Sequence, residues 1–406
     1  MLRQSHRALY AAYDRFPSAK GAATHIARMA ACLFEHAGDG ALLVLGDSNL
    51  PVYQCDDRIE AVRFRSSQPD LLDRINAYQR LVYRETAKQA ATLEIAHFRD
   101  PWGGVPILRA LEDKGSGCRT VYEINGLPSI EWPERYDGMA RSTIALLRNE
   151  ERHCWERADA IVVPSQTIAS NLIRLGAPAA RISVIPNGAD ISDAPLPPRP
   201  IDAPYFLYFG ALQPWQGLPV LIKAFARLAD FADLKLVICA SLPAEACGWI
   251  VEMAQAHGVA ERIIWRHELD HSTLRTWVAH AHASIAPLTQ CARNIEQGCA
   301  PLKILESMAA GVPVAASDLP VVREIIESDV NGVLVPPDRP ADLARALRFL
   351  IDYPARRLML GRAARERIAS SLTWGHAVSS LSDLFRGLHP STRKDECARQ
   401  SVLAEL

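Results

Sequence analysis

Two charged residues, Lys303 and Glu306, stand three positions apart in the apolar stretch that follows Pro301. A helix whose first residue is Pro301 places Lys303 in its first turn, beside free backbone N–H groups and the positive end of the helix dipole. A cation is unfavourable there unless an anion binds, so Lys303 predicts a phosphate site. Glu306, on the same face, has the reach to accept hydrogen bonds from two neighbouring ribose hydroxyls. The alternative is a solvent-facing ion pair, which is common at this spacing.

The segments around this helix predict one unit of a parallel sheet. Residues 282–288 form an apolar run expected as a buried strand, 289–300 form a polar loop, and 312–316 form the next strand. Strand, loop, helix and strand in this order place the loop at the carboxyl edge of the sheet, where such sheets bind ligands.

The same alternation recurs along the chain and predicts an α/β fold with two Rossmann-like domains, whose parallel sheets are flanked by helices. A proline-rich stretch predicts a linker at 191–203, between an N-terminal domain at 1–190 and a C-terminal domain at 204–372. Apolar residues at helical spacing predict a last helix at 373–388, and a polar tail follows at 389–406.

A glycine-containing turn follows the first strand of each predicted domain. Gly21, with Lys20 beside it, precedes a helix in the first half, and Gly210 opens the turn that contains Gln216 in the second half. A residue without a Cβ lets another group approach the backbone, and N–H groups at such turns can bind phosphate oxygens. The alternative for Gly21 is an ordinary turn glycine.

Composition excludes several other functions. The 406 residues carry a formal net charge of -1, which offers no electrostatic reason for nucleic-acid binding. Nine cysteines are scattered without metal-ligand spacing, which favours reduced thiols in a cytoplasmic protein and predicts no metal site. No apolar run approaches the roughly 20 residues that a membrane-spanning helix requires.

The run P-L-K-I-L-E-S-M-A-A-G-V-P-V-A-A-S-D-L-P-V-V-R-E, from Pro301 to Glu324, resembles the donor-site segment of family-4 retaining glycosyltransferases. N-G-V-L-V-P-P at 331–337 and P-N-G-A-D at 186–190 are similar to further segments of that family. The resemblance implies a GT-B fold, in which the two domains face each other across a cleft and the last helix, at 373–388, crosses back to the N-terminal domain. It also implies a hexosyltransferase that moves a sugar from a UDP-sugar or GDP-sugar to a hydroxyl acceptor (a glycan, a lipid-linked or a small molecule), with retention and without a metal or cofactor.

The resemblance also implies roles for individual residues. Lys303 would stabilise the departing diphosphate, and Glu306 would hold the nucleotide ribose. Asn125 stands where many members carry a histidine that touches the transferred sugar, while Gly21 and Lys20 would face the acceptor and the donor phosphate. The remaining donor-binding positions are Gly210, Gln216, His267, Gly298, Cys299, Ala300, Pro301 and Leu302.

Three positions depart from the family pattern. Ala211 and Gln216 stand where members usually carry an arginine and a lysine, and Gly298 replaces the first of two paired glutamates. Either Lys303 supplies the charge alone, or the chain is a noncatalytic partner with the same fold. A third hypothesis keeps the fold and changes the reaction, as in sugar-nucleotide epimerases. No metal ligand pair such as Asp-x-Asp is placed in a loop.

The helical stretch 71–91 interleaves Arg74, Arg80 and Arg84 with Tyr78 and Tyr83. This pattern predicts either an acceptor- or lipid-facing surface, with peripheral contact at the inner membrane face, or a solvated helix face with aromatic packing. The sequence does not specify the sugar, the base, the acceptor or the oligomeric state.

Overall fold

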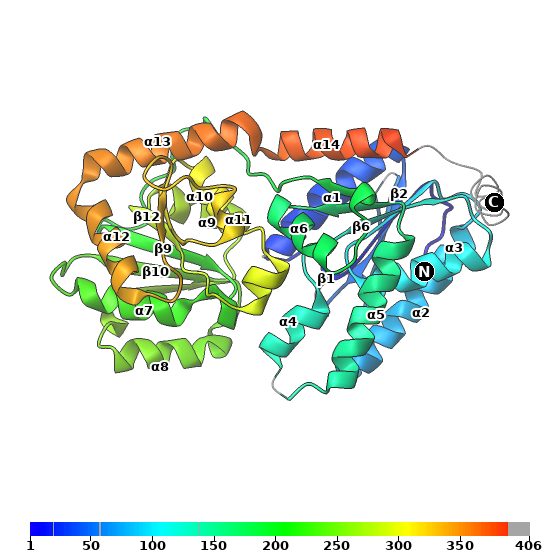
Figure 1. Ribbon diagram of the computed structural model, residues 1–406, viewed down its shortest axis with the longest axis horizontal. Coiled ribbons are helices and arrows are strands. Elements are labelled where there is room, and N and C mark those ends of the chain that lie inside the picture. Colours follow the sequence, from blue (N-terminus) through cyan, green and yellow to red (C-terminus); the bar gives the residue numbers. More distant parts are fainter. Residues whose placement is uncertain (19, 57, 137, 389–406) are drawn as a thin grey trace.

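The computed structural model describes residues 1–18, 20–56, 58–136 and 138–388. It contains two β-sheets side by side, each with helices on both faces (Figure 1). The predicted α/β fold class is therefore confirmed. The predicted polar tail at 389–406 lies outside the described residues.

The first sheet has eight strands in the order β3-β4-β2-β1-β5-β6-β7-β8. All paired strands are parallel except β3, which runs antiparallel to β4. The strand order reverses at β1, which lies between β2 and β5, so ligands are expected beyond the carboxyl end of β1. The strands are β1 (Ala8–Arg15), β2 (Gly40–Leu45), β3 (Tyr53–Asp56), β4 (Ile59–Phe64), β5 (Ile95–Phe98), β6 (Arg119–Glu123), β7 (Ala160–Val163) and β8 (Ile182–Val184).

Alternate residues of β1 face two different layers of helices. Leu9 and Ala11 pack in one core with side chains from α2, α3, α5 and α6, and Tyr10 packs in a second core with side chains from α1 and α14. The helices of the first half are α1 (Gly21–Ala37), α2 (Leu71–Gln89), α3 (Pro101–Asp113), α4 (Pro128–Arg135), α5 (Arg141–Arg157) and α6 (Gln166–Arg174).

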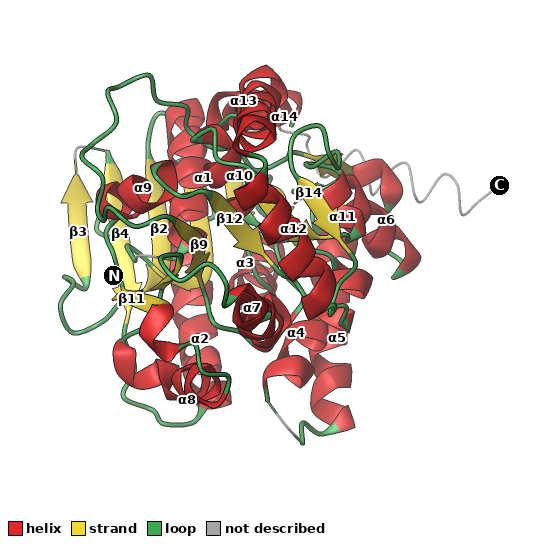
Figure 2. Ribbon diagram, turned by 90° about the vertical axis from the view of Figure 1, so that its left-hand side faces the viewer, coloured by secondary structure: helices red, strands yellow, loops and turns green. Residues whose placement is uncertain are grey.

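The second sheet is parallel throughout, in the order β11-β10-β9-β12-β13-β14, and its order reverses at β9. Figure 2, which looks at the end of the molecule that carries this sheet, shows helices on both sides of the strands. The strands are β9 (Tyr205–Gly210), β10 (Lys235–Ala240), β11 (Ile263–His267), β12 (Ala283–Ala286), β13 (Val314–Ser317) and β14 (Val333–Val335). The helices are α7 (Leu218–Phe225), α8 (Gly248–Ala256), α9 (His271–Ala279), α10 (Leu302–Ala309), α11 (Pro320–Arg323), α12 (Pro340–Asp352) and α13 (Pro354–Ser371).

The last described helix, α14 (Trp374–Gly387), runs along α1 of the first half (Figure 1). Trp374, Leu381 and Phe385 are buried in the core that they share with β1 and α1, which confirms the apolar face predicted for this helix. Residues 191–203 connect the two halves without a helix or strand. The domain boundaries around them remain a prediction.

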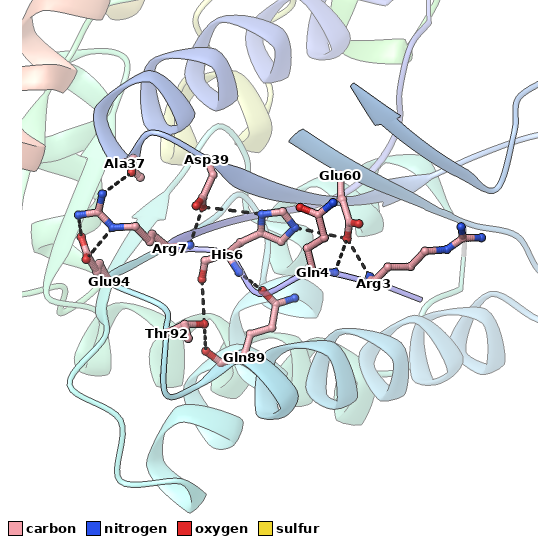
Figure 3. Close-up of polar contacts among 10 residues, drawn as sticks. All are labelled: Arg3, Gln4, His6, Arg7, Ala37, Asp39, Glu60, Gln89, Thr92 and Glu94. Atoms are coloured by element: carbon pink, nitrogen blue, oxygen red, sulfur yellow. Dashed lines mark hydrogen bonds and ion pairs between the residues drawn. The ribbon is translucent and has the colours of Figure 1, made fainter. Parts of the chain in front are cut away.

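A polar cluster anchors the chain at the amino end of β1 (Figure 3). The Glu60 carboxylate accepts the backbone N–H of Arg3 at 2.9 Å and lies 3.3 Å from Nε2 of the buried His6. Arg7 donates to the Glu94 carboxylate at 2.8 Å and to the carbonyl oxygen of Ala37 at 2.8 Å. These contacts fix the start of β1 at the edge of the sheet opposite to the expected ligand edge.

Polar contacts also join the two halves. Glu324, at the end of α11, accepts the backbone N–H groups of Gln166 and Thr167 at 2.8 and 2.7 Å. Both N–H groups lie in the first turn of α6, where no helical carbonyl can accept them. A side chain of the second half therefore caps a helix of the first half.

Two details of the predicted phosphate segment differ from expectation. Pro301 is not the first helical residue: its backbone is extended (φ -74°, ψ 98°), and its carbonyl accepts the N–H of Ile304, so α10 begins one residue later. The polar loop predicted at 289–300 contains one π-helical turn, Arg293–Gln297. The Asn294 amide holds this turn by donating to the carbonyl oxygens of Trp215 and Thr289 at 3.0 and 2.8 Å.

Candidate functional site

A cavity of about 340 Å³ lies between the two halves, where the strand order of both sheets reverses. Eleven of the predicted site residues line it, which are Lys20, Gly21, Asn125, Gly210, Gln216, Cys299, Ala300, Pro301, Leu302, Lys303 and Glu306. His267 and Gly298 are absent from its described lining.

Lys303 lies in the first turn of α10 and is buried. Its Nζ donates to Oε1 of Gln216 at 2.6 Å and lies 4.0 Å from the centroid of the Tyr208 ring. Burial lowers the pKa of Lys303 to about 7, because the charged form loses solvation that these two contacts replace only in part. An anion in the cavity would restore that solvation, so the lysine is suited to a phosphate ligand.

Glu306 lies one turn further along α10 and faces the same cavity. Burial raises its pKa to about 7, and the nearby charge of Lys303 opposes this increase. No hydrogen bond or ion pair engages its carboxylate among the residues that the structure describes. The alternative of a solvent-facing ion pair is therefore wrong, because Lys303 is buried and bonds to Gln216 instead.

Two glycines let the walls of the cavity come close together. A Cβ on Gly21 would lie 3.1 Å from Cδ1 of Leu302, across the cleft. Gly210 has a left-handed backbone (φ 113°), and a Cβ there would lie 3.6 Å from Cε of Lys303. Gly21 begins α1 and Leu302 begins α10, so the two helix starts lie against each other at Gly21. This fits the predicted need for close approach at that glycine.

On the first-half wall, the buried carboxylate of Glu123 at the end of β6 holds several cavity residues. Its oxygens lie 3.0 Å from Nδ1 of His25, 3.1 Å from Nε of Arg99, and within hydrogen-bond distance of the Asn125 amide. It also accepts the Tyr10 hydroxyl at 2.9 Å. The predicted contact residue Asn125 is therefore positioned by Glu123, with His25 and Arg99 on either side.

His25, Arg99 and Arg293 also line the cavity and were not predicted as site residues. His25 stands four positions after Gly21, hence on the same face of α1, and Arg99 directly follows β5 at the carboxyl edge. Both positions carried a usable indication in the sequence. Arg293 carried none, because its place depends on the π-helical turn.

His267 and Gly298 serve other contacts. Nδ1 of His267 lies 3.1 Å from the carbonyl oxygen of Leu242, and its ring stacks on Trp265 with centroids 6.2 Å apart. Leu269 and His271, just beyond it, line the cavity in its place. Gly298 has φ 94°, and a Cβ there would meet Ile168 at 2.8 Å, so this glycine allows the loop to pack against α6.

No group of three or more histidine, cysteine, aspartate or glutamate side chains forms a metal-binding cluster in the described ranges. No described helix combines the length and the apolar composition needed to cross a membrane. On α2, Tyr78 is fully buried and belongs to the core, whereas Tyr83 is partly exposed and its hydroxyl donates to Asp113 at 2.7 Å.

Two family models match the chain. Residues 19–193 match Glycosyltransferase Family 4, and residues 197–367 match Glycosyl transferases group 1. The chain belongs to the family-4 glycosyltransferases. The two matched regions of this family-4 chain meet near residue 195, between the two sheets. Each matched region therefore contributes one wall of the cavity.

Curated relatives share the family-4 sequence over part of their length. A D-inositol 3-phosphate glycosyltransferase from Xylanimonas cellulosilytica is 29% identical over 245 residues, which cover 56% of this chain and 57% of the relative. A glycogen synthase from Mycobacterium tuberculosis is 28% identical over 231 residues, 56% of this chain and 54% of the relative. The chain thus matches little more than half the length of these relatives.

Solved structures confirm the GT-B fold of this family-4 chain. Sucrose-phosphate synthase from Thermosynechococcus elongatus aligns with a TM-score of 0.78 at 18% identity, over 94% of this chain and 99% of that one. The Anabaena protein HepE, in complex with UDP-glucose, aligns with a TM-score of 0.72 at 16% identity, over 94% of this chain and 100% of that one.

Proposed function

We propose that this chain is a retaining hexosyltransferase that moves a sugar from a nucleoside-diphosphate sugar to a hydroxyl acceptor. The observation that carries the proposal is the pair of Lys303 and Glu306 on one cavity wall, where a buried ammonium lies beside a carboxylate that has no partner among the described residues. A nucleotide sugar supplies both complements, because its diphosphate is anionic and its ribose carries two neighbouring hydroxyls. The complex of HepE with UDP-glucose supports a donor of this class.

The reaction needs chiefly a stable departing diphosphate. The sugar C1–O bond to the diphosphate breaks, the acceptor oxygen bonds to C1 from the same face, and the acceptor proton passes to the departing diphosphate. Lys303 and the backbone N–H groups at the start of α10 act where negative charge develops. The proposal needs no protein nucleophile and assigns no step to a metal.

The first-half wall would receive the acceptor and the transferred sugar. Asn125, held by Glu123, offers an amide to a sugar hydroxyl but cannot act as an acid or base near neutral pH. Gly21 and Lys20 border the same space, where closure of the cleft excludes water and orients the acceptor. The scattered cysteines favour a cytoplasmic location.

A calorimetric titration with UDP, GDP and ADP, followed by NMR assays with the matching nucleotide sugars, tests this proposal. We expect one nucleoside diphosphate to bind, Glu306→Ala to weaken it, and Lys303→Ala to slow sugar transfer by about 100-fold or more. Lys223→Ala, an exposed lysine on α7, serves as the control and should change neither quantity.

Three results would lead elsewhere. If no nucleoside diphosphate binds, the chain is better explained as a noncatalytic partner. The uncharged residues Ala211 and Gln216 are the observation that suggests this alternative. Inversion of a sugar carbon without an acceptor favours an epimerase. Parent rates in both Lys303→Ala and Glu306→Ala would reject the assignment of the site.

A further inference from the structure

The charge of the proposed donor exceeds what α10 supplies. A nucleoside diphosphate carries at least two negative charges, and Lys303 contributes one positive charge. The turn after β9, which also borders the cavity, contributes none, because Ala211 and Gln216 are uncharged. A second cation is therefore needed near Lys303, among the described residues that line the cavity.

Arg293 is the cavity residue that meets this need. The other arginine that lines the cavity, Arg99, lies on the first-half wall and is paired there with two carboxylates, Asp14 and Glu123. Lys20 also borders the cavity, but its side chain is exposed to solvent at the rim. Arg293 lies on the same half as Lys303, and its side chain is only 15% exposed.

Arg293 lines the cavity together with Cys299, in the loop that leads into α10. Burial raises the pKa of the Cys299 thiol, and the nearby charge of Arg293 opposes this rise. The charge of Arg293 and that of Lys303 repel each other, which contributes to the lowered pKa of Lys303. Lys303 and Arg293 thus place two cations beside the cavity, and Glu131 offsets part of the charge of Arg293.

Arg293 is held in place from across the cleft. Its Nε donates to Oε1 of Glu131, on α4 of the first half, at 3.1 Å, and the guanidinium lies 5.3 Å from the centroid of the Trp215 ring. The Gln297 amide donates to the same Glu131 oxygen at 3.0 Å. Glu131 thus fixes both ends of the π-helical turn that carries Arg293.

We infer that Arg293 is a second cationic contact of the donor diphosphate, in place of charge at Ala211 and Gln216, and that Glu131 is its positioning residue. The inference rests on the proposed function. It links donor binding to the arrangement of the two halves, because the residue that contacts the diphosphate is oriented by a carboxylate of the opposite wall.

Calorimetry with three ligands tests this contact: the nucleoside diphosphate that binds the parent best, its monophosphate and its nucleoside. Arg293→Gln should weaken the diphosphate by about tenfold or more and leave the nucleoside within about twofold. Arg293→Lys should restore part of the loss, because it returns the charge without the fork that fits Glu131. Glu131→Gln should weaken the diphosphate by a smaller factor and leave the nucleoside unchanged.

Arg348→Gln is the matched control. Arg348 also pairs with a carboxylate, Asp230 at 2.6 Å, and lies 4.9 Å from an aromatic centroid, that of Phe231, but it is remote from the cavity. It should change none of the three affinities. The dependence of diphosphate affinity on salt should be shallower in Arg293→Gln than in Arg348→Gln, since one ionic contact is lost.

The outcomes separate this inference from the proposed function. If the parent binds and transfers, and Arg293→Gln binds the diphosphate as tightly as the parent, only the inference is overturned. An equal loss for diphosphate and nucleoside also overturns it, because that result marks a structural role. If the parent binds no nucleoside diphosphate, both fall. Should Arg293→Gln fail to fold, Arg293→Lys and Glu131→Gln decide by the same ratio of diphosphate to nucleoside affinity.

Discussion

The two walls of the cleft each carry a glutamate, one buried (Glu123) and one partly buried (Glu306), and the two carboxylates have opposite surroundings. Burial alone would raise the pKa of Glu123, but His25 and His97 beside it hold that pKa well below its ordinary value. Burial raises the pKa of Glu306 to about 7, and Lys303 opposes this only in part. Glu123 is surrounded by donors, whereas Glu306 has no partner within the part of the chain that the structure describes.

The difference separates a carboxylate that organises the fold from one that awaits a ligand. A fully partnered buried network is rigid and stabilises one arrangement, while a partly satisfied one carries an energetic cost. Glu60 in the amino-end cluster belongs with Glu123, since its pKa is also lowered by neighbouring donors against the effect of burial (Figure 3). Glu306 is the exception among the three, and it lies in the cleft.

Glu123→Gln should show the largest effect, and the effect should fall on stability. Removing this charge leaves His25, His97 and Arg99 without their shared partner, and we expect the free energy of unfolding to fall by about 3–5 kcal/mol. Because the folded-state pKa is depressed, the contribution of Glu123 is present above the unfolded pKa of about 4.3 and is lost as the pH falls through the folded value. Urea denaturation at several pH values measures both.

The matched control for this variant is Glu112→Gln, whose carboxylate pairs with Arg157 at the surface. It should cost less than about 1 kcal/mol. Equal costs for the two variants would show that the partners of Glu123 do not depend on its charge.

Glu306→Gln should reverse the pattern, with no loss of stability and a clear loss of binding. Within the described residues the carboxylate has no partner to lose, and burial raises its pKa, so at neutral pH the neutral amide should leave the free energy of unfolding equal to or above that of the parent. Affinity for the nucleoside diphosphate should fall by about tenfold, because an amide oxygen is a weaker acceptor for two hydroxyls. A 2′,3′-dideoxy nucleotide should bind parent and variant equally, and a difference there would remove the ribose from the role of Glu306.

The pH dependence of binding is the smallest expected effect. With a pKa of about 7, Lys303 loses its charge as the pH rises, so diphosphate affinity should fall by about fivefold between pH 7 and pH 8. The measurement belongs in the Glu306→Gln background, because Glu306 titrates in the same range. Lys303→Arg should abolish the dependence, since arginine stays charged. An unchanged slope in that variant would assign the titration to another group.

The sequence predicted the residues whose role follows from local geometry. Lys303 and Glu306 could be found because a helix start and an i, i+3 spacing are properties of one short segment. His25 and Arg99 could have been found from the same local signals, whereas Arg293 could not, because its place depends on the π-helical turn. The hydrogen bond between Tyr10 and Glu123 joins residues 113 positions apart, and no local pattern predicts it.

The same limit explains the two predicted residues that the cavity lacks. His267 follows a strand at the correct edge, but its ring stacks on Trp265 instead of facing the cavity. Gly298 was predicted from its place in the family pattern, whereas the π-helical turn before it leads that part of the loop towards α6. The fold class was predictable from alternation alone, because β- and α-periodicity differ along the whole chain.

Because Glu324 caps α6 from the opposite half, the backbone amides of Gln166 and Thr167 can report the separation of the two halves. Any separation of the sheets wide enough to admit a substrate past Glu324 strips Gln166 and Thr167 of their acceptor and exposes their N–H groups to water. Deuterium uptake at these two positions would therefore report the opening of the cleft without an attached probe. A bound nucleotide that holds the halves together would slow that uptake at both amides at once.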